Sequence, residues 1–108
     1  MVKESIITII KTYLSVLASY GIHPDKAVLF GSFSRGEEKE YSDIDLIVIA
    51  PEFDIRRELS FVKQLWLARA RADIRIEPIA CGRAEWQNGS YRPIIEIARD
   101  EGFEILAG

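Results

Sequence analysis

Gly31-Ser32 is followed after ten residues by Asp43-Ile44-Asp45, and this stretch decides how the rest of the chain is interpreted. Side chains of a β-strand alternate between its two faces, so a strand from Asp43 to Ile49 would point Asp43 and Asp45 the same way. Two carboxylates at the mouth of a buried strand repel each other and lose hydration, a cost that a hard cation such as Mg2+ can offset. The pattern predicts a cation site, although a lone Asp-x-Asp is also common on solvated loops.

The residues before Gly31 predict a short buried strand, Ala27 to Phe30, that runs directly into the Gly-Ser pair. Glycine lets backbone N–H groups approach a phosphate closely, and the Ser32 hydroxyl adds a further donor. Residues 33–37 can form one helical turn whose N-terminus favours negative charge, and Arg35 adds a cation. A Gly-Ser pair after a strand is by itself most often an ordinary turn. Together with the downstream acids, it predicts a phosphate-binding turn.

Two segments, Gly31-Ser32-Phe33-Ser34-Arg35-Gly36 and Ser42-Asp43-Ile44-Asp45-Leu46, resemble the signature of the minimal nucleotidyltransferases in the DNA polymerase beta superfamily. The resemblance implies the palm-like nucleotidyltransferase fold of that superfamily. It also implies transfer of a nucleoside monophosphate, foremost AMP from ATP, to an acceptor hydroxyl with release of pyrophosphate. The expected cofactor is Mg2+, as two ions for which Mn2+ can substitute.

The same resemblance assigns residues to the site. The nucleotide would be bound by the glycine turn and its polar neighbours, namely Gly31, Ser32, Arg35 and Ser42. The catalytic residues would also be the metal ligands, namely Asp43, Asp45 and a third carboxylate from an adjacent strand.

The third carboxylate is expected on a strand predicted from Asp73 to Ala80. Glu77 is the best positional match, although the superfamily usually places an aspartate there. Asp73 is the second candidate, and an ion pair between Glu77 and Arg75 is the alternative to a catalytic role for Glu77.

The composition predicts one small soluble domain over residues 1–108, with 48% hydrophobic and 29% charged residues. Fourteen basic against seventeen acidic side chains give a net charge of −3, which argues against broad binding of nucleic acid. No apolar stretch has the length of a membrane span, and the first residues do not resemble a signal peptide. We therefore expect a cytoplasmic protein, in which the single Cys81 is a structural thiol.

Helical periodicity predicts two amphipathic helices. The first covers residues 3–20, and the second runs from a cap at Asp54 to about Arg71. The buried stripe of the second helix would consist of Leu59, Val62, Leu65 and Trp66.

The remainder of the chain completes the expected fold. Residues 81–92, which include Trp86 and Tyr91, have the composition of a loop. Pro93 should open a helix that Gly102 ends, and residues 103–106 should form a short final strand. The predicted fold class is therefore α/β (α+β), with a small mixed, partly antiparallel sheet flanked by helices.

A chain this short is expected to need a partner that presents the acceptor. The resemblance implies a helical HEPN-like toxin with this chain as its antitoxin, and a homo-oligomer is the alternative. The N-terminal helix and the segment from Trp86 to Tyr91 are candidate docking surfaces, against the simpler explanation of core packing and a plain loop. The rival function is a catalytically weak or inactive nucleotide-binding antitoxin, which the glutamate at the third acidic position keeps open.

Overall fold

A four-stranded sheet forms the centre of the computed structural model, which describes residues 2–55 and 59–107. The strands are β1 (Lys26–Phe30), β2 (Ile44–Ala50), β3 (Ile76–Gly82) and β4 (Phe103–Leu106), in the spatial order β3-β2-β1-β4. β1 pairs antiparallel with both β2 and β4, whereas β2 and β3 are parallel. This arrangement confirms the predicted mixed, partly antiparallel sheet.

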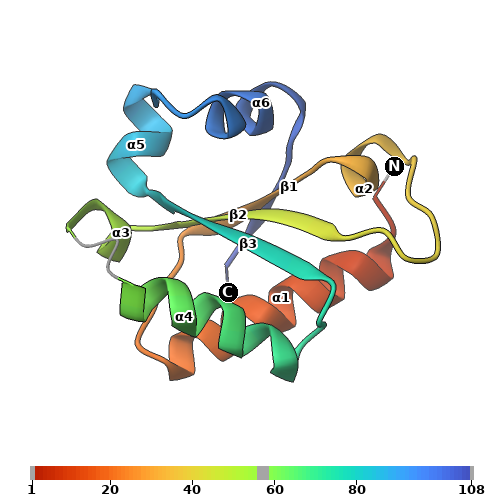
Figure 1. Cartoon of the computed structure of the whole chain (residues 1–108), viewed down its shortest axis with the longest axis horizontal. Helices are drawn as coiled ribbons and strands as arrows, with labels where there is room; N and C mark the ends of the chain where they lie inside the picture. The colour runs from red at the N-terminus through yellow and green to blue at the C-terminus, as the bar shows by residue number, and fades with distance from the viewer. Residues whose placement is uncertain (1, 56–58, 108) are drawn as a thin grey trace.

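Helices cover both faces of the sheet (Figure 1). They are α1 (Glu4–Ser19), α2 (Ser32–Arg35), α3 (Glu52–Ile55), α4 (Leu59–Ala68), the 3-10 turn η1 (Arg69–Arg71), α5 (Arg83–Asn88) and α6 (Pro93–Glu101). In Figure 1, α1 and α4 lie on one face, α5 and α6 lie on the other, and α2 lies at one end. Within the described ranges, no helix combines the length and the apolar character that crossing a bilayer requires.

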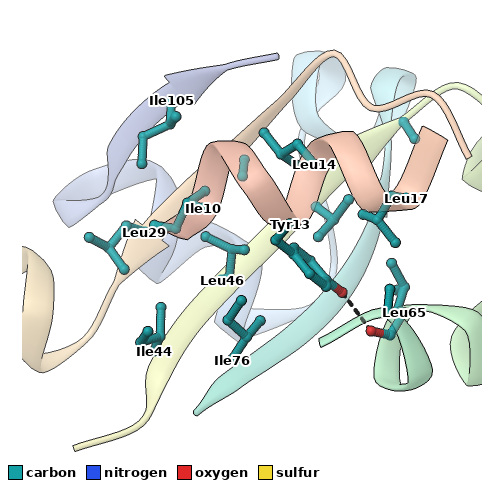
Figure 2. Close-up of a cluster of buried hydrophobic side chains, with 14 of the residues drawn as sticks. Ile10, Tyr13, Leu14, Leu17, Leu29, Ile44, Leu46, Leu65, Ile76 and Ile105 are labelled. Atoms are coloured by element: carbon teal, nitrogen blue, oxygen red, sulfur yellow. Dashed lines mark hydrogen bonds between the residues drawn. The ribbon is translucent and has the colours of Figure 1, made fainter. Parts of the chain in front are cut away.

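The alternation of β2 divides its side chains between two apolar clusters. Ile44, Leu46 and Val48 pack with α1, whereas Ile47 and Ile49 pack with α5 and α6 on the opposite face. The predicted alternation of this strand is therefore confirmed, as is the long N-terminal helix. Figure 2 shows the first cluster, in which the Tyr13 hydroxyl donates a hydrogen bond of 2.7 Å to the carbonyl oxygen of Leu65. This bond ties α1 to α4 and leaves no buried hydroxyl unpaired at that point.

The predicted helix from Asp54 to Arg71 is wrong at its start and, within its predicted buried stripe, at Trp66. Asp54 lies inside α3, and its carboxylate accepts hydrogen bonds of 3.1 Å from the backbone N–H of Ala84 in α5. Trp66 is 41% exposed, and the Arg69 guanidinium lies over its ring at 4.6 Å, whereas Leu65 is buried as expected. Residues 56–58 and the Leu59 side chain lie outside the described part of the chain.

The predicted loop over residues 81–92 is also wrong, because it contains the short helix α5. Trp86 on this helix is only 9% exposed and packs in the second cluster, which removes it from the candidate docking surface. Tyr91 is 88% exposed. Glycines on both sides of α5 suggested a loop, but tertiary contacts with Asp54 and the sheet stabilise a helix there.

The third strand begins later than predicted. Asp73 starts a turn instead, since its side chain accepts a hydrogen bond of 2.8 Å from the Arg75 N–H. β3 is an edge strand, which explains how it accommodates Pro78. The C-terminal predictions are confirmed, because α6 begins at Pro93 and β4 covers residues 103–106.

Candidate active site at one end of the sheet

The predicted acidic residues meet where β1 ends and where β2 and β3 begin. Because β1 is antiparallel to β2, Phe30 pairs with Asp45, and Gly31 follows at the same end of the sheet. Because β2 is parallel to β3, Asp45 in turn lies opposite Glu77. The ends of three strands therefore bring the glycine turn and two carboxylates to one place. In Figure 1 this is the end of the sheet that carries α2.

The carboxylates lie on the face of the sheet that carries α5 and α6. Asp45 alternates with Ile44 and Leu46, which point to the α1 cluster, so its side chain leaves the strand on the opposite face. Asp43 directly precedes β2 and is exposed, whereas Asp45 and Glu77 are half-buried. The acids thus stand at the solvent-facing rim of a buried sheet.

Gly31 is required by its backbone conformation, and it also lies close to Asp45. Its backbone has φ 75° and ψ −152°, a conformation that is essentially restricted to glycine. A Cβ atom at this position would collide with the Asp45 carboxylate oxygen Oδ2. A side chain at residue 31 would therefore strain the turn and displace the Asp45 carboxylate.

Burial and mutual repulsion raise the pKa of two of the acids. Desolvation is the largest cause for Asp45, followed by repulsion from Asp43, and the positive charge of Arg35 partly offsets both effects on its pKa. The pKa of Glu77 is raised by desolvation, by repulsion from Asp43 and Asp45, and by a hydrogen bond with Asp43 that needs a shared proton. Arg69 lowers the pKa of Glu77 in part.

The parallel register places Asp45 opposite Glu77, and Asp43 lies two residues before Asp45 at the start of β2, so the three carboxylates are neighbours. Among residues 2–55 and 59–107, no three His, Cys, Asp or Glu side chains are already arranged as a metal site. The donor set nevertheless fits a hard divalent cation, because it consists of carboxylate oxygens whose negative charges repel each other. Their assignment as catalytic metal ligands stays a prediction.

Asp73, the second candidate for the third acid, pairs with Arg75 instead. Its carboxylate accepts hydrogen bonds from the Arg75 side chain, 3.0 Å from Nε to Oδ1 and 2.8 Å from Nη2 to Oδ2. These bonds lower the pKa of Asp73. The partner of Arg75 is thus Asp73, and Glu77 is the candidate that the fold places opposite Asp45.

The predicted nucleotide-binding residues have different surroundings. Ser32 opens α2 next to the Gly31 turn. Arg35 forms ion pairs with Glu37 and with Glu101. The Ser42 hydroxyl accepts a hydrogen bond of 2.7 Å from the Lys39 N–H, so it closes the loop that leads to β2.

Sequence reasoning missed Glu101 at the end of α6. Its oxygen Oε1 lies 3.1 Å from Nη1 of Arg35 and 3.4 Å from the backbone nitrogen of Gly31. Glu101 is seventy residues from Gly31 in the sequence, so only the spatial proximity of α6 to the end of β1 brings them together. The sequence predicted the end of α6 but carried no signal for this contact.

The sheet, the glycine turn and the acids define a nucleotidyltransferase domain, and sequence comparison agrees. Residues 7–96 match the family model described as "Nucleotidyltransferase domain", so the chain belongs to this family. The predicted family is therefore confirmed.

Two individual proteins illustrate the similarity. A Methanocaldococcus jannaschii protein named "Putative protein adenylyltransferase" is 31% identical over 78 residues, which cover 71% of this chain and 69% of that protein. The crystal structure of a "putative nucleotidyltransferase" from Sulfolobus solfataricus superimposes with a TM-score of 0.54, 17% identity and coverage of 96% of this chain and 87% of the other. The second similarity confirms the fold.

Proposed function

We propose that the protein transfers AMP from ATP to a hydroxyl group on an acceptor protein and releases pyrophosphate. The main support for the proposal is that Asp45, Glu77 and Asp43 converge beside the Gly31 turn. The backbone conformation of this turn is essentially restricted to glycine. Membership of the nucleotidyltransferase family supports the reaction class. The name of the M. jannaschii relative supports both the adenylyl group and a protein acceptor.

In this proposal Asp43, Asp45 and Glu77 would hold two Mg2+ ions, or Mn2+ in their place. Such ions neutralise the triphosphate and lower the pKa of the attacking hydroxyl. Gly31 and Ser32 would orient the phosphates through the backbone N–H and the hydroxyl, and Arg35 would add charge-assisted hydrogen bonds. Ser42 would keep the loop before Asp43 in place. Glu77 would also be the carboxylate that accepts the proton of the acceptor hydroxyl.

We propose in addition that the acceptor is a separate helical protein of the HEPN type, for which this chain is the antitoxin, or a second copy of the chain. The support is the resemblance of the motif to small stand-alone nucleotidyltransferases and the protein acceptor in the relative's name. Copurification with a helical protein encoded next to this chain would support the pairing. A chain that stays monomeric and unpartnered in its native extract would contradict it.

The reaction is tested with two labelled forms of ATP. The protein is incubated with Mg2+ and the co-expressed candidate acceptor, and with ATP labelled at either the α or the γ phosphate. We expect the α label to appear on the acceptor, the γ label to appear in pyrophosphate, and EDTA to stop both. Thermal stabilisation by ATP without pyrophosphate release, under Mg2+ and under Mn2+, would favour the inactive nucleotide-binding antitoxin instead.

A further inference from the structure

The Glu101 carboxylate already contacts two of the donors that we assign to phosphate binding, the Gly31 N–H and the Arg35 guanidinium. One carboxylate oxygen, Oε1, accepts from the Gly31 N–H at 3.4 Å and from Nη1 of Arg35 at 3.1 Å. A carboxylate oxygen and a phosphate oxygen are alike in charge and in hydrogen-bond acceptance, so the two would compete for this position. We infer that Glu101 is an internal competitor of the nucleotide, and that its side chain must leave Gly31 and Arg35 when the β and γ phosphates bind.

The backbone of Glu101 is held in place, so only its side chain needs to move. α6 ends at this residue, and the Gly102 N–H donates a bond of 2.8 Å to the Ala98 carbonyl oxygen. A Cβ atom at position 102 would collide with Val28 of β1, which shows how closely the end of α6 packs on the sheet. The Glu101 side chain is itself 33% exposed, so a rotamer change can carry its carboxylate into solvent.

The contacts of Glu101 with Gly31 and Arg35 are weak enough for a ligand to replace them. The distance of 3.4 Å to the Gly31 nitrogen is longer than the usual range for N–H···O bonds, so this bond is weak. Arg35 is shared with Glu37, and both carboxylates raise the pKa of its guanidinium. A triphosphate would therefore meet Arg35 with its positive charge already neutralised by Glu37 and Glu101.

This inference uses the proposed function in one respect, namely that Gly31 and Arg35 bind phosphate. It adds a residue that sets nucleotide affinity and that should act on the distal phosphates only. AMP lacks the β and γ phosphates, so its binding should not depend on Glu101. Glu101 thereby tunes the preference of the site for triphosphates over monophosphates.

The test compares Glu101→Ala with Glu104→Ala by isothermal titration calorimetry. Glu104 is a matched control, since it is a carboxylate three residues away in β4 that pairs with Lys26 instead. The probes are an ATP analogue that cannot be cleaved between its α and β phosphates, inorganic tripolyphosphate and AMP, each with Mg2+. We expect Glu101→Ala to bind the analogue and tripolyphosphate roughly three- to tenfold more tightly than the parent protein. AMP affinity, and every affinity of Glu104→Ala, should stay unchanged.

Three outcomes would overturn the inference: equal or weaker binding of the analogue by Glu101→Ala, an equal gain for AMP, or no tripolyphosphate binding by either protein. The binding assay involves no transfer, so its result is independent of the labelled-ATP experiment. Tighter binding by Glu101→Ala without any AMP transfer would support the competitor and reject the proposed reaction. Transfer by the parent protein with unchanged binding by Glu101→Ala would do the reverse.

Discussion

The two ends of the sheet differ in how their acidic residues are paired. At one end an acid is paired with an arginine, and at the other the acids lie next to each other. At the end where β1 begins, Asp25 accepts two hydrogen bonds of 2.7 Å from Arg83, and this pairing lowers the pKa of Asp25. At the end where β1 stops, Asp45 and Glu77 face each other and Asp43, and their pKa values are raised.

At the first end an acidic and a basic side chain stabilise each other. At the second end neighbouring carboxylates repel each other, and nearby arginines offset this repulsion only in part. Proteins retain such local destabilisation mainly where a ligand or a reaction makes use of it. The contrast therefore marks the second end as the functional one. Substitutions at both ends test whether this difference in charge pairing reflects function.

The largest effect is expected from the same substitution made once at each end. Asp45→Asn should lower the rate of AMP transfer by roughly a thousandfold or more, because it removes a carboxylate that would bind the metal. Asp25→Asn should leave the rate within about twofold, since Asp25 lies at the other end of β1. Initial rates of pyrophosphate release with the acceptor present measure both. Full activity of Asp45→Asn at limiting Mg2+ would remove Asp45 from the site.

A smaller effect is expected when the glycine turn is changed. Gly31→Ala places a Cβ atom against the Asp45 carboxylate and imposes φ 75° on a residue with a side chain. We expect destabilisation of about 1–3 kcal/mol from the backbone strain, together with a transfer rate lowered roughly ten- to a hundredfold. Urea unfolding and transfer assays measure the two effects.

Gly21→Ala is the control for this substitution. Gly21 also has a positive φ, of 83°, but a Cβ atom there would have no atom within 4 Å, and the residue follows α1. It should therefore show backbone strain with no loss of transfer. Equal losses of transfer in both variants would mean that the approach of Gly31 to Asp45 has no role in catalysis.

The parts of the fold that the sequence predicted are those that depend on nearby residues. The buried alternation of β2 and the helical spacing of α1 are local periodicities, so both were correct. That Asp43 and Asp45 point the same way was predicted from the side-chain alternation of one strand. Their family signature lies within a short stretch, and this made the reaction class predictable.

The parts that it did not predict depend on contacts between distant segments. Asp54 satisfies the N–H of Ala84, thirty residues away, and thereby supports a helix where the composition suggested a loop. Trp66 has the spacing of a core residue, but the helix turns it outward beneath Arg69. Glu101 reaches Gly31 only because α6 packs back on β1. No local pattern encodes such contacts, because each requires the finished topology.

Replacing an acid by asparagine should change the melting temperature in opposite directions at the two ends of the sheet. Because the pKa of Asp45 is higher in the folded state, the protonated carboxyl stabilises the fold and the ionised one does not. This stabilisation is complete only below the ordinary pKa of 3.8. That contribution is lost as the pH rises through the higher pKa of the folded state. Without added metal, Asp45→Asn should therefore melt a few degrees above the parent protein at pH 7, and the difference should shrink towards pH 3.5.

Adding Mg2+ provides the control for this measurement. A ligand that binds only the folded state raises its stability, so Mg2+ should raise the melting temperature of the parent protein and change that of Asp45→Asn much less. Calorimetry over a pH series measures both effects. An Asp45→Asn protein that melts below the parent at pH 7 would show that the acid is stabilised by contacts within the fold.

The smallest effect is expected from Asp25→Asn, and its sign should be opposite. The hydrogen bonds from Arg83 lower the pKa of Asp25, so ionised Asp25 stabilises the folded state above its ordinary pKa of 3.8. That contribution is lost as the pH falls through the lower pKa of the folded state. Asp25→Asn should thus melt a degree or two below the parent at pH 7, with little difference in acid, because exposed ion pairs contribute little. If Asp25→Asn and Asp45→Asn shifted the melting temperature in the same direction, the difference between the two ends would not lie in their charges, and the argument that unbalanced charge marks the active site would fail.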